Sequence, residues 1–543
     1  MINTKEAVNK IKSMSHEELI QYALQKEEEI MIYKQQLAEL RKSKFGSLSE
    51  KSTYLSISLF NEIEDTVNHA SSEELEEFTA STKKIKKKTK KKELDYSNLE
   101  THVIHHDLDD KTCPDCGSKL KELQPQIYTI LRCIPAHYFL EKHIVHNYVC
   151  ATCTAASDTM KEVKAPDAPV KLIEGSVASS SVVAKIAYDK FVLDIPLYRQ
   201  EADLKRMKVP LPRQNMSNWL MRCSSDYLES VFNKMWTDLK NLDVIHMDET
   251  TVKCLEESKE TGRTKSYEWT ALSGRFESKQ MALYFYKDSR KHENVENIIG
   301  KESQCIIHSD GYEAYHKEYG KMTVGCMAHL RRYFVQAKES DSCDSAYKAL
   351  NSDSKRTEYL NEHPGFKNII EVLSIINELF KIERNLNENQ SSPSQILETR
   401  QEKAQPIVDR LFACIKELQP EYAVKGKMGK AITYALEQEE YIRNYLKDGR
   451  LEISNNRAER AIKPFVMARK NFLFSNTRSG AKTSSIYFSL IESAKMNNLN
   501  PMKYLEYVLD TLSTKGLYDE VIERVLPYSK ELPIELKLNK SDR

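Results

Sequence analysis

The pattern of apolar and polar positions changes character several times along the chain, and its first part is helical. Within residues 16–42, apolar side chains recur near a heptad spacing, at Leu19, Ala23, Ile30, Leu37 and Leu40. Charged side chains cover the outside of this seam, so residues 1–45 are predicted to be helical. Two interpretations stay open: a surface helix on a larger body, and a short coiled coil that joins copies of the chain.

A second helical pattern fills residues 170–235. The predicted helices cover 177–191, 198–207 and 214–227. The run Lys-Val-Pro-Leu-Pro at 208–212 separates the last two, and two helices joined by a short turn are typical of a helix-turn-helix. Such a motif presents the first residues of its second helix to the DNA major groove, here Arg213, Gln214 and Asn215. An ordinary helical bundle with Trp219 in its core is the alternative.

Residues 240–340 change to short apolar runs that are typical of strands. The predicted strands cover 244–247, 267–272, 281–286, 305–308 and 323–326, and the predicted helices cover 292–299 and 328–338. Asp248 ends the first strand, and Asp310 lies near the end of the fourth. Three strands, a helix and two further strands in this order predict a ribonuclease-H-like core, in which helices flank a mixed sheet.

The C-terminal half interrupts this core and then completes it. Residues 341–450 predict a helical insertion, with amphipathic helices at 366–383, 394–418 and 427–446. Residues 451–480 return to the core, with a helix at 456–463 that Pro464 stops and a strand-like run at 471–474. Residues 481–543 are predicted to be largely helical. The fold class is therefore a multidomain α+β protein.

Composition and charge narrow the class of protein. The chain has 543 residues, with 81 Lys and Arg against 80 Asp and Glu, and its net charge is +1. This balance excludes a uniformly basic, histone-like protein but allows local basic patches. No apolar run approaches the ~18–20 residues of a membrane span, and the N-terminus has no apolar signal segment. We therefore expect a cytoplasmic protein without membrane association.

One basic patch lies in residues 46–100, which are predicted to be a disordered linker. An acidic patch is followed by Lys-Lys-Ile-Lys-Lys-Lys-Thr-Lys-Lys-Lys at 83–92, and such a block cannot bury itself. It serves either as a tether that neutralises DNA phosphates or as a solubilising linker.

Residues 101–165 contain two Cys-x-x-Cys pairs. Their cysteines are Cys113, Cys116, Cys150 and Cys153. Two such pairs with strand-like segments between them are typical of a zinc ribbon, in which four thiolates bind one structural Zn²⁺. A redox pair is the alternative. Replacement of one cysteine ligand by His137, His143 or His146 also stays open.

Three acidic residues are predicted to converge at one edge of the sheet. Asp248 and Asp310 end neighbouring strands, and Glu459 lies on the helix that returns after the insertion. Converging carboxylates can bind two divalent ions that stabilise both oxygens of an in-line phosphoryl displacement. The alternatives are a turn at Asp310-Gly311 and a capping box between Asn456 and Glu459. Glu249 is expected to point away from the site, because successive strand residues face opposite sides.

Several strings, taken in order, resemble the DDE transposases of the insertion-sequence-sixty-six family. They include His246-Met-Asp-Glu-Thr250, Ser309-Asp-Gly-Tyr312, Cys326-Met-Ala-His-Leu-Arg-Arg332, Ser454-Asn-Asn-Arg-Ala-Glu-Arg460 and Ala468-Arg-Lys-Asn-Phe-Leu-Phe474. The resemblance covers nearly the whole chain and implies a ribonuclease-H-like domain whose DDE triad is Asp248, Asp310 and Glu459. One position departs from the pattern: the family usually has Asp before the Asn-Asn pair, where this chain has Ser454, and Ser454 can still cap the helix.

The resemblance implies a bacterial, nucleoid-associated transposase that cuts and joins insertion-sequence ends with Mg²⁺ or Mn²⁺. The expected partners are transposon-end and target DNA, further copies of the chain, and accessory proteins of the same element. Predicted phosphate contacts are Arg331, Arg332, Arg469 and Lys470, with surface salt bridges as the alternative. The rival function is a catalytically decayed or repurposed DNA-binding regulator that keeps the zinc module and the helix-turn-helix, and Ser454 is the one feature in its favour.

Overall fold

The computed structural model describes Tyr22 and residues 138–143, 170–316, 320–422 and 426–538. The predicted N-terminal helix except Tyr22, the Lys-rich linker and the four predicted zinc ligands lie outside the described residues. The chain divides into two compact units, and every element named below belongs to the larger one, which includes Asp167–Arg543. Within the described ranges, no helix is long and apolar enough to cross a membrane.

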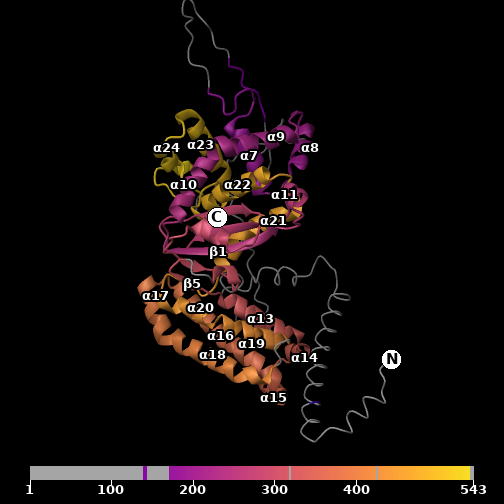
Figure 1. The fold of residues 1–543 in the computed structure, drawn as a ribbon, viewed down its shortest axis with the longest axis vertical. Coiled ribbons are helices and arrows are strands. Elements are labelled where there is room, and N and C mark those ends of the chain that lie inside the picture. Colours follow the sequence, from indigo (N-terminus) through magenta and orange to yellow (C-terminus); the bar gives the residue numbers. More distant parts are fainter. Residues whose placement is uncertain (1–21, 23–137, 144–169, 317–319, 423–425, 539–543) are drawn as a thin grey trace, which may run out of the picture. The chain divides into compact units, whose positions relative to one another are not determined.

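A five-stranded mixed sheet lies at the centre of this unit (Figure 1). Its strands are β1 (Val244–Val252), β2 (Ser266–Ser273), β3 (Ala282–Lys287), β4 (Ile306–His308) and β5 (Met322–Val324). Their order is β3-β2-β1-β4-β5. The β1–β2 and β2–β3 pairs are antiparallel, whereas the β1–β4 and β4–β5 pairs are parallel. The predicted mixed sheet is thus present, with all five strands close to their expected positions.

One strand boundary in the sequence analysis was wrong. β1 does not end at Asp248 but continues to Val252, because β2 pairs with it antiparallel from Ile245 to Val252. The β-branched run of Thr250, Thr251 and Val252 suits a strand. β4 pairs with β1 only as far as His246, so Asp248 lies just past the point where the β1–β4 ladder stops.

Helices from both ends of the described chain form one layer next to the sheet (Figure 1). They are α7 (Ser180–Phe191), α8 (Leu197–Arg206), α9 (Arg213–Cys223), α10 (Glu229–Leu239), α22 (Arg478–Met496), α23 (Pro501–Lys515) and α24 (Asp519–Val525). α22 packs along β3, and α7 packs on α22 and α23. The Phe191 ring stacks on Tyr487 with 5.1 Å between ring centroids, which fixes an early helix to a late one.

The predicted insertion forms a second helical layer on the other side of the sheet in Figure 1. It packs on α13 (Met327–Ser340), and its helices are α14 (Cys343–Ala349), α15 (Asp353–Glu362), α16 (Pro364–Glu388), α17 (Pro393–Thr399), α18 (Gln405–Leu418), α19 (Lys427–Glu437) and α20 (Glu439–Arg443). On α16, the buried residues recur at the spacing of one helix face and include Ile369, Val372, Ile376 and Leu379. This face joins α13, α18 and α19 in one apolar core.

A buried arginine fastens the insertion to the segment that returns to the sheet. Arg400 lies in a π-helical turn, Arg400–Ala404, and donates from Nε and Nη2 to the two carboxylate oxygens of Glu383, each at 2.7 Å. Its remaining bonds go to the backbone carbonyls of Tyr445, Asp448 and Leu451. Burying the Arg400 guanidinium costs desolvation free energy, and these hydrogen bonds to its N–H groups offset that cost. These bonds of Arg400 hold in place the segment that directly precedes α21 (Asn456–Phe472).

The helix α21 also departs from the sequence analysis. It does not stop at Pro464 but continues to Phe472, and the predicted strand at 471–474 is absent. Proline in a helix interior removes one hydrogen bond and usually ends or kinks the helix. Here Ile462, Phe465 and Val466 on both sides of the proline are buried, and α21 packs on β1 and β2. Burial of these apolar side chains outweighs the lost bond.

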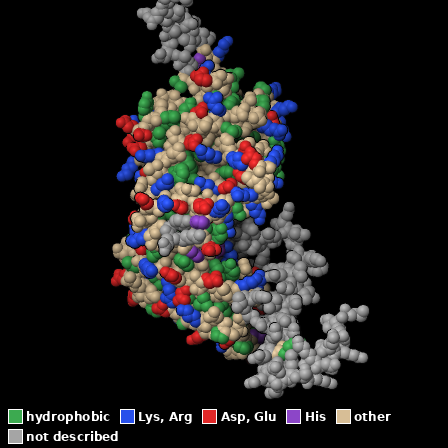
Figure 2. Space-filling model, viewed as in Figure 1, with side chains coloured by type: hydrophobic (Ala, Val, Ile, Leu, Met, Phe, Trp, Pro, Cys, Tyr) green, Lys and Arg blue, Asp and Glu red, His purple; other side chains and the backbone are tan. Residues whose placement is uncertain are grey.

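The viewed face of the described residues carries acidic and basic side chains interspersed with each other (Figure 2). This mixture agrees with the nearly neutral net charge. This face therefore presents no large area of one charge sign, and any electrostatic role depends on individual side chains.

We predict that Glu268 makes the folded protein less stable as pH rises. Burial in β2 raises the pKa of Glu268 from its ordinary 4.5 to about 8. Between these values the unfolded chain releases a proton that the folded chain keeps, so stability is fully present below pH 4.5 and falls toward pH 8. The slope is about 1.4 kcal/mol per pH unit where Glu268 alone titrates.

The measurement is urea unfolding of the wild type and of Glu268→Gln across this pH range. Gln mimics the neutral acid, so the variant should show a flatter dependence. Parallel curves for the two proteins would contradict the prediction.

Candidate active site

The three predicted carboxylates meet at the edge of the sheet where the β1–β4 ladder ends. Asp248 lies on β1, Asp310 lies two residues after β4, and Glu459 lies in the first turn of α21, which packs on β1. Burial raises the pKa of Asp248 well above its usual range, and the charges of Glu249, Asp310 and Glu459 raise it further. The structure therefore brings the predicted triad into electrostatic contact.

Backbone groups hold the two aspartates in place. The backbone N–H of Glu249 donates to Asp248 Oδ1 at 2.8 Å, and the backbone N–H of Tyr312 donates to Asp310 Oδ1 at 2.9 Å. Gly311, between Asp310 and Tyr312, has no room for a side chain, because a Cβ there would lie 2.6 Å from the ring of Tyr434. The Asp310-Gly311 pair does form a turn, and this turn holds the carboxylate at the site.

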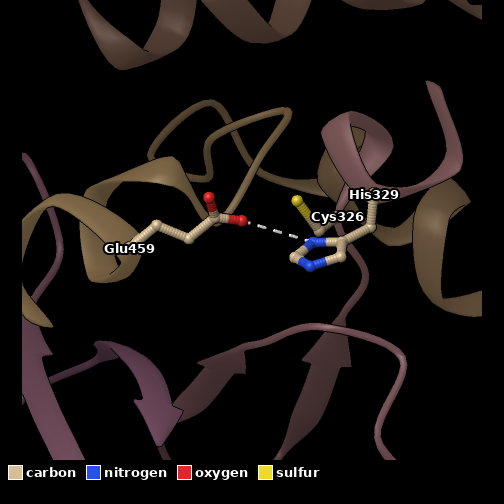
Figure 3. A group of neighbouring side chains, drawn as sticks. All are labelled: Cys326, His329 and Glu459. Atoms are coloured by element: carbon tan, nitrogen blue, oxygen red, sulfur yellow. Dashed lines mark ion pairs between the residues drawn. The ribbon is translucent and has the colours of Figure 1, made fainter. Parts of the chain in front are cut away.

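Glu459 faces Cys326 and His329 at the start of α13 (Figure 3). Arg332 Nη2 donates to the two Glu459 oxygens at 3.3 and 3.2 Å, and His329 Nδ1 lies 3.5 Å from one of them. Arg332 Nη1 also lies 3.2 Å from His329 Nε2. An arginine can only donate, so His329 accepts at Nε2 and carries its hydrogen on Nδ1, facing Glu459. Arg332, a predicted phosphate contact, thus pairs with a predicted catalytic carboxylate.

Cys326 completes this group of side chains. Its sulfur, one nitrogen of His329 and one oxygen of Glu459 all lie within 4.8 Å of one another. Burial, and then the charge of Glu459, raises the pKa of the Cys326 thiol to about 12, so the thiol is neutral. Its sulfur accepts the backbone N–H of Asn455 at 3.1 Å. In this arrangement Cys326 is a packing and hydrogen-bonding partner of α21.

Glu249 was expected to point away from the site, but it lies close enough for its charge to act on Asp248 and for the charge of Asp310 to act on it. Its carboxylate is paired with Arg290 and accepts the hydroxyl of Tyr315. The guanidinium of Arg290 lies 3.6 Å from the ring centroid of Tyr312. Burial and then Asp310 raise the pKa of Glu249, and Arg290 opposes this shift. The sequence analysis did not identify Arg290, and only its position in the fold reveals its role.

A buried polar network joins the three elements that carry the carboxylates. His246 on β1 and His308 on β4 are fully buried, and their rings stack with 4.6 Å between centroids. His246 Nδ1 lies 3.0 Å from Asn455 Oδ1, and Asn455 Nδ2 donates to the Met247 carbonyl at 2.8 Å. Burial, and then His246, lowers the pKa of His308 to about 3, so His308 is neutral.

The fourth member of this network is Glu452. Its carboxylate lies 3.0 Å from His246 Nε2, and its backbone carbonyl lies 2.6 Å from His308 Nε2. Burial alone would raise the pKa of Glu452, but His246 beside it holds that pKa below the usual range. Both histidines therefore contact the segment that leads into α21.

The start of α21 corrects two expectations. Its N-cap is Asn455 rather than Ser454, and the Asn455 side chain makes no cap bond, because it is used by His246 and Met247. A capping box between Asn456 and Glu459 is also absent, since Glu459 pairs with Arg332. Ser454 is buried beside this network.

The predicted DNA contacts lie in different surroundings. Arg213, Gln214 and Asn215 are exposed at the start of α9, which packs on α8, while Trp219 on the same helix is buried. Arg331 donates from Nε to Asn377 at 3.0 Å. On α21, Arg469 donates to the hydroxyl of Thr250 at 3.1 Å and to the carbonyl of Thr251, and Lys470 is exposed.

Comparison with known protein families matches three parts of the chain. The model described as "Transposase IS66 family" matches residues 175–483, which is more than half of the chain. The "zinc-finger binding domain of transposase IS66" matches residues 110–154, and the "IS66 C-terminal element" matches residues 489–528. The chain therefore belongs to the IS66 transposase family. The zinc-finger match includes all four predicted cysteine ligands and supports a structural zinc.

Three relatives come from Sinorhizobium fredii, and each is named only as an uncharacterized protein. The protein y4jD is 24% identical over 79% of this chain and 81% of its own length. The protein y4qI is 29% identical over 67% of this chain and 64% of its own, and y4hP is 25% identical over 87% and 84%. No solved structure matches the chain.

We predict that Asn455→Ala lowers the free energy of unfolding by about 1–3 kcal/mol, because it leaves a buried carbonyl and His246 without their partner. Urea denaturation measures the change. Asn456→Ala is the matched control: Asn456 is also buried, but its side-chain oxygen has no hydrogen-bond partner, so its loss should be smaller. Equal losses would contradict a specific role for Asn455.

Proposed function

We propose that this chain is a DDE-type transposase that cuts and joins insertion-sequence ends, with the mixed sheet as a ribonuclease-H-like core. The observation that carries the proposal is the convergence of Asp310 and Glu459 on the buried carboxylate of Asp248, whose pKa is raised by burial and then by the charges of Glu249, Asp310 and Glu459. Their elements lie far apart in the sequence. A buried cluster of carboxylates disfavours its own ionised form, and such clusters are typical of functional sites. Metal-dependent phosphoryl transfer is a chemistry that uses such converging carboxylates, and it is the one that the family match favours.

The same side chains suit a divalent cation such as Mg²⁺ or Mn²⁺. Asp248, Asp310 and Glu459 would be its ligands, since they supply the hard carboxylate oxygens that these ions prefer. A bound cation would favour the ionised form of Asp248, which burial and the neighbouring carboxylates disfavour. When bound, divalent cations stabilise the negative charge on the attacking and leaving oxygens of an in-line displacement.

The proposed reaction has two steps. Hydrolysis at each transposon end releases a 3′-hydroxyl, and that hydroxyl then attacks target DNA. Both steps are phosphoryl transfers without a covalent protein intermediate. Arg332 would orient Glu459 from one side, and the turn at Gly311 would hold the carboxylate of Asp310.

DNA would be held by surfaces outside the triad. We propose that α8 and α9 act as a helix-turn-helix whose exposed Arg213, Gln214 and Asn215 read a groove, and that the zinc module adds a second contact. Copies of the chain would have to cooperate to process two ends, and accessory proteins of the element would assist. The proposed place of action is the bacterial nucleoid.

A DNA-binding regulator without catalysis is the second candidate. Ser454, in place of the usual Asp, is the observation in its favour. Ser454 is not among the proposed cation ligands, and Asp248, Asp310 and Glu459 are all retained, so the catalytic function is preferred. Metal-dependent nicking of terminal-repeat DNA separates the two functions, because a regulator would bind that DNA and leave it intact.

We predict that Asp248→Asn, Asp310→Asn and Glu459→Gln each lower end cleavage and strand transfer by about 10²-fold or more, because both steps use the same charges. Amides keep the shape of the side chain and remove its charge. Gel assays of cleaved and joined DNA with Mg²⁺ or Mn²⁺ measure the loss, and binding to transposon ends should persist.

The control variant is Glu249→Gln, in the residue next to Asp248, and it should be much milder. Wild-type cleavage by any of the three amide variants would remove that residue from the triad. Full activity in EDTA would exclude a metal-dependent mechanism.

We predict that Cys113→Ser with Cys150→Ser abolishes the structural zinc, because each Cys-x-x-Cys pair then loses one thiolate. Metal content per purified chain is the measurement. Cys414→Ser, which changes a free cysteine of the insertion, should leave the zinc content unchanged. One zinc per chain in the double variant would show that other residues are the ligands.

A further inference from the structure

Two consecutive apolar side chains are exposed directly after α21. Leu473 is 66% exposed and Phe474 is 43% exposed, and Met467 on the last turns of the same helix is 41% exposed. Large apolar side chains that gather on a surface usually mark a contact. Here they follow the helix that carries Glu459, so their position is fixed relative to the proposed catalytic carboxylates.

The backbone at Leu473 has a rare conformation. Its φ is +66° and its ψ is −45°, and the backbone N–H of Phe474 donates to the Phe472 carbonyl at 2.8 Å. This is a γ-turn of the rare, strained kind with positive φ. Among the described residues, the other non-glycine residues with positive φ are polar: Asp194, Lys208, Gln390 and Asn498. Glycine would adopt this turn without strain, so the leucine side chain is retained at a cost.

The turn is held rigidly from both sides. The backbone N–H of Leu473 donates to the Arg469 carbonyl at 2.9 Å, and the backbone N–H of Ser475 donates to the Lys253 carbonyl at 2.9 Å. Leu255 in turn donates its backbone N–H to the Ser475 carbonyl at 2.9 Å. The turn is therefore fastened to the end of β1 and projects its two side chains from a fixed base.

The exposed charges next to the turn are positive. Residues 460–482 contain six Lys or Arg and no Asp or Glu, and two of these cations, Arg478 and Lys482, are paired with acidic side chains of neighbouring helices. Lys470 and Lys253 are exposed beside the turn. The nearby acidic helix α11 (Leu255–Thr261) directs Glu257 and Glu260 to Arg478, each at 2.6 Å. A polyanion is therefore the partner whose charge complements this surface.

We propose that Leu473 and Phe474 form an apolar wedge that inserts among the bases of bound DNA, while Lys470 and Lys253 contact its phosphates. Proteins that distort DNA commonly insert apolar side chains between base steps, and aromatic rings stack on bases that leave the helix. The wedge would open the duplex at the C-terminal end of α21, about 20 Å along the helix from Glu459. This inference rests on the proposed function only in requiring that the chain binds DNA.

The test uses the full chain in an Asp248→Asn background, so that no DNA is cut. The probes are a matched duplex and the same duplex with one mismatch, each with 2-aminopurine at that position, whose fluorescence rises when the base unstacks. An already unpaired base is the cheapest to open. The Asp248→Asn protein should therefore bind the mismatched duplex about tenfold tighter than the matched one. Its binding should also raise the 2-aminopurine fluorescence of that duplex.

The test variant is Leu473→Gly with Phe474→Ser, which keeps the backbone turn accessible and removes both apolar side chains. It should lose the mismatch preference and the fluorescence rise. Its melting temperature should not fall, because glycine relieves the strain of the turn, and the salt dependence of binding should persist, because the cations remain. Leu517→Ser with Tyr518→Ser is the matched control, since these neighbours are also exposed, at 46% and 71%, far from this surface in the sequence.

Retention of the preference by the Leu473 and Phe474 variant would overturn the wedge. A change in sedimentation of that variant, with its DNA behaviour unaltered, would instead make this surface a contact between copies and would also overturn it. Absence of binding to either duplex by the background protein itself would contradict the proposed function, so the two failures can be told apart.

Discussion

Repulsion between carboxylates is the physical constraint on which this structure depends. Burial, and then the charges of Glu249, Asp310 and Glu459, disfavour the ionised form of Asp248 and raise its pKa. A chain folds around such a cluster only if rigid elements and nearby cations compensate. Arg332 offsets the charge of Glu459, and Arg290 offsets the charge of Glu249.

The rigid part of this compensation is the buried network around His246. Two stacked imidazoles and one asparagine connect β1, β4 and the start of α21, only two to four residues from each carboxylate. A shift of any one of these elements would leave buried polar groups without hydrogen-bond partners. This costs more free energy than the same loss at the surface, where water replaces the partner. The network thus keeps three distant segments in register against the repulsion of the site that they form.

The helical insertion contributes to the same geometry from a distance. Arg400 binds both its partner Glu383 and the carbonyls of the segment that leads into α21. Gly449 lies in that segment, and a Cβ there would meet the Pro393 carbonyl oxygen at 1.8 Å. The insertion is therefore a support that delivers Glu459 to the sheet, rather than an independent appendage.

Local sequence patterns were sufficient to predict the five strands, the helical character of the insertion and the three acidic residues that the fold brings close together. The alternation of apolar and polar residues, helical periodicity and the order of motifs are properties of the sequence, and they can be recognised without the fold. The partners of those residues were decided only by the tertiary structure. Arg332, which is predicted to contact phosphate, pairs with Glu459 in the fold, and Arg290 pairs with Glu249. Neither pair could be predicted, because ion pairs join positions that sequence spacing does not relate.

The same reason explains the errors at α21. Local propensity predicted that the helix ends at Pro464 and that the apolar run at 471–474 forms a strand. Burial of Ile462, Phe465 and Val466 carried the helix through Pro464 to Phe472, and the turn that follows is held by bonds from Lys253 and Leu255. Local propensity amounts to about 1–3 kcal/mol for one residue, and packing across distant segments exceeds it.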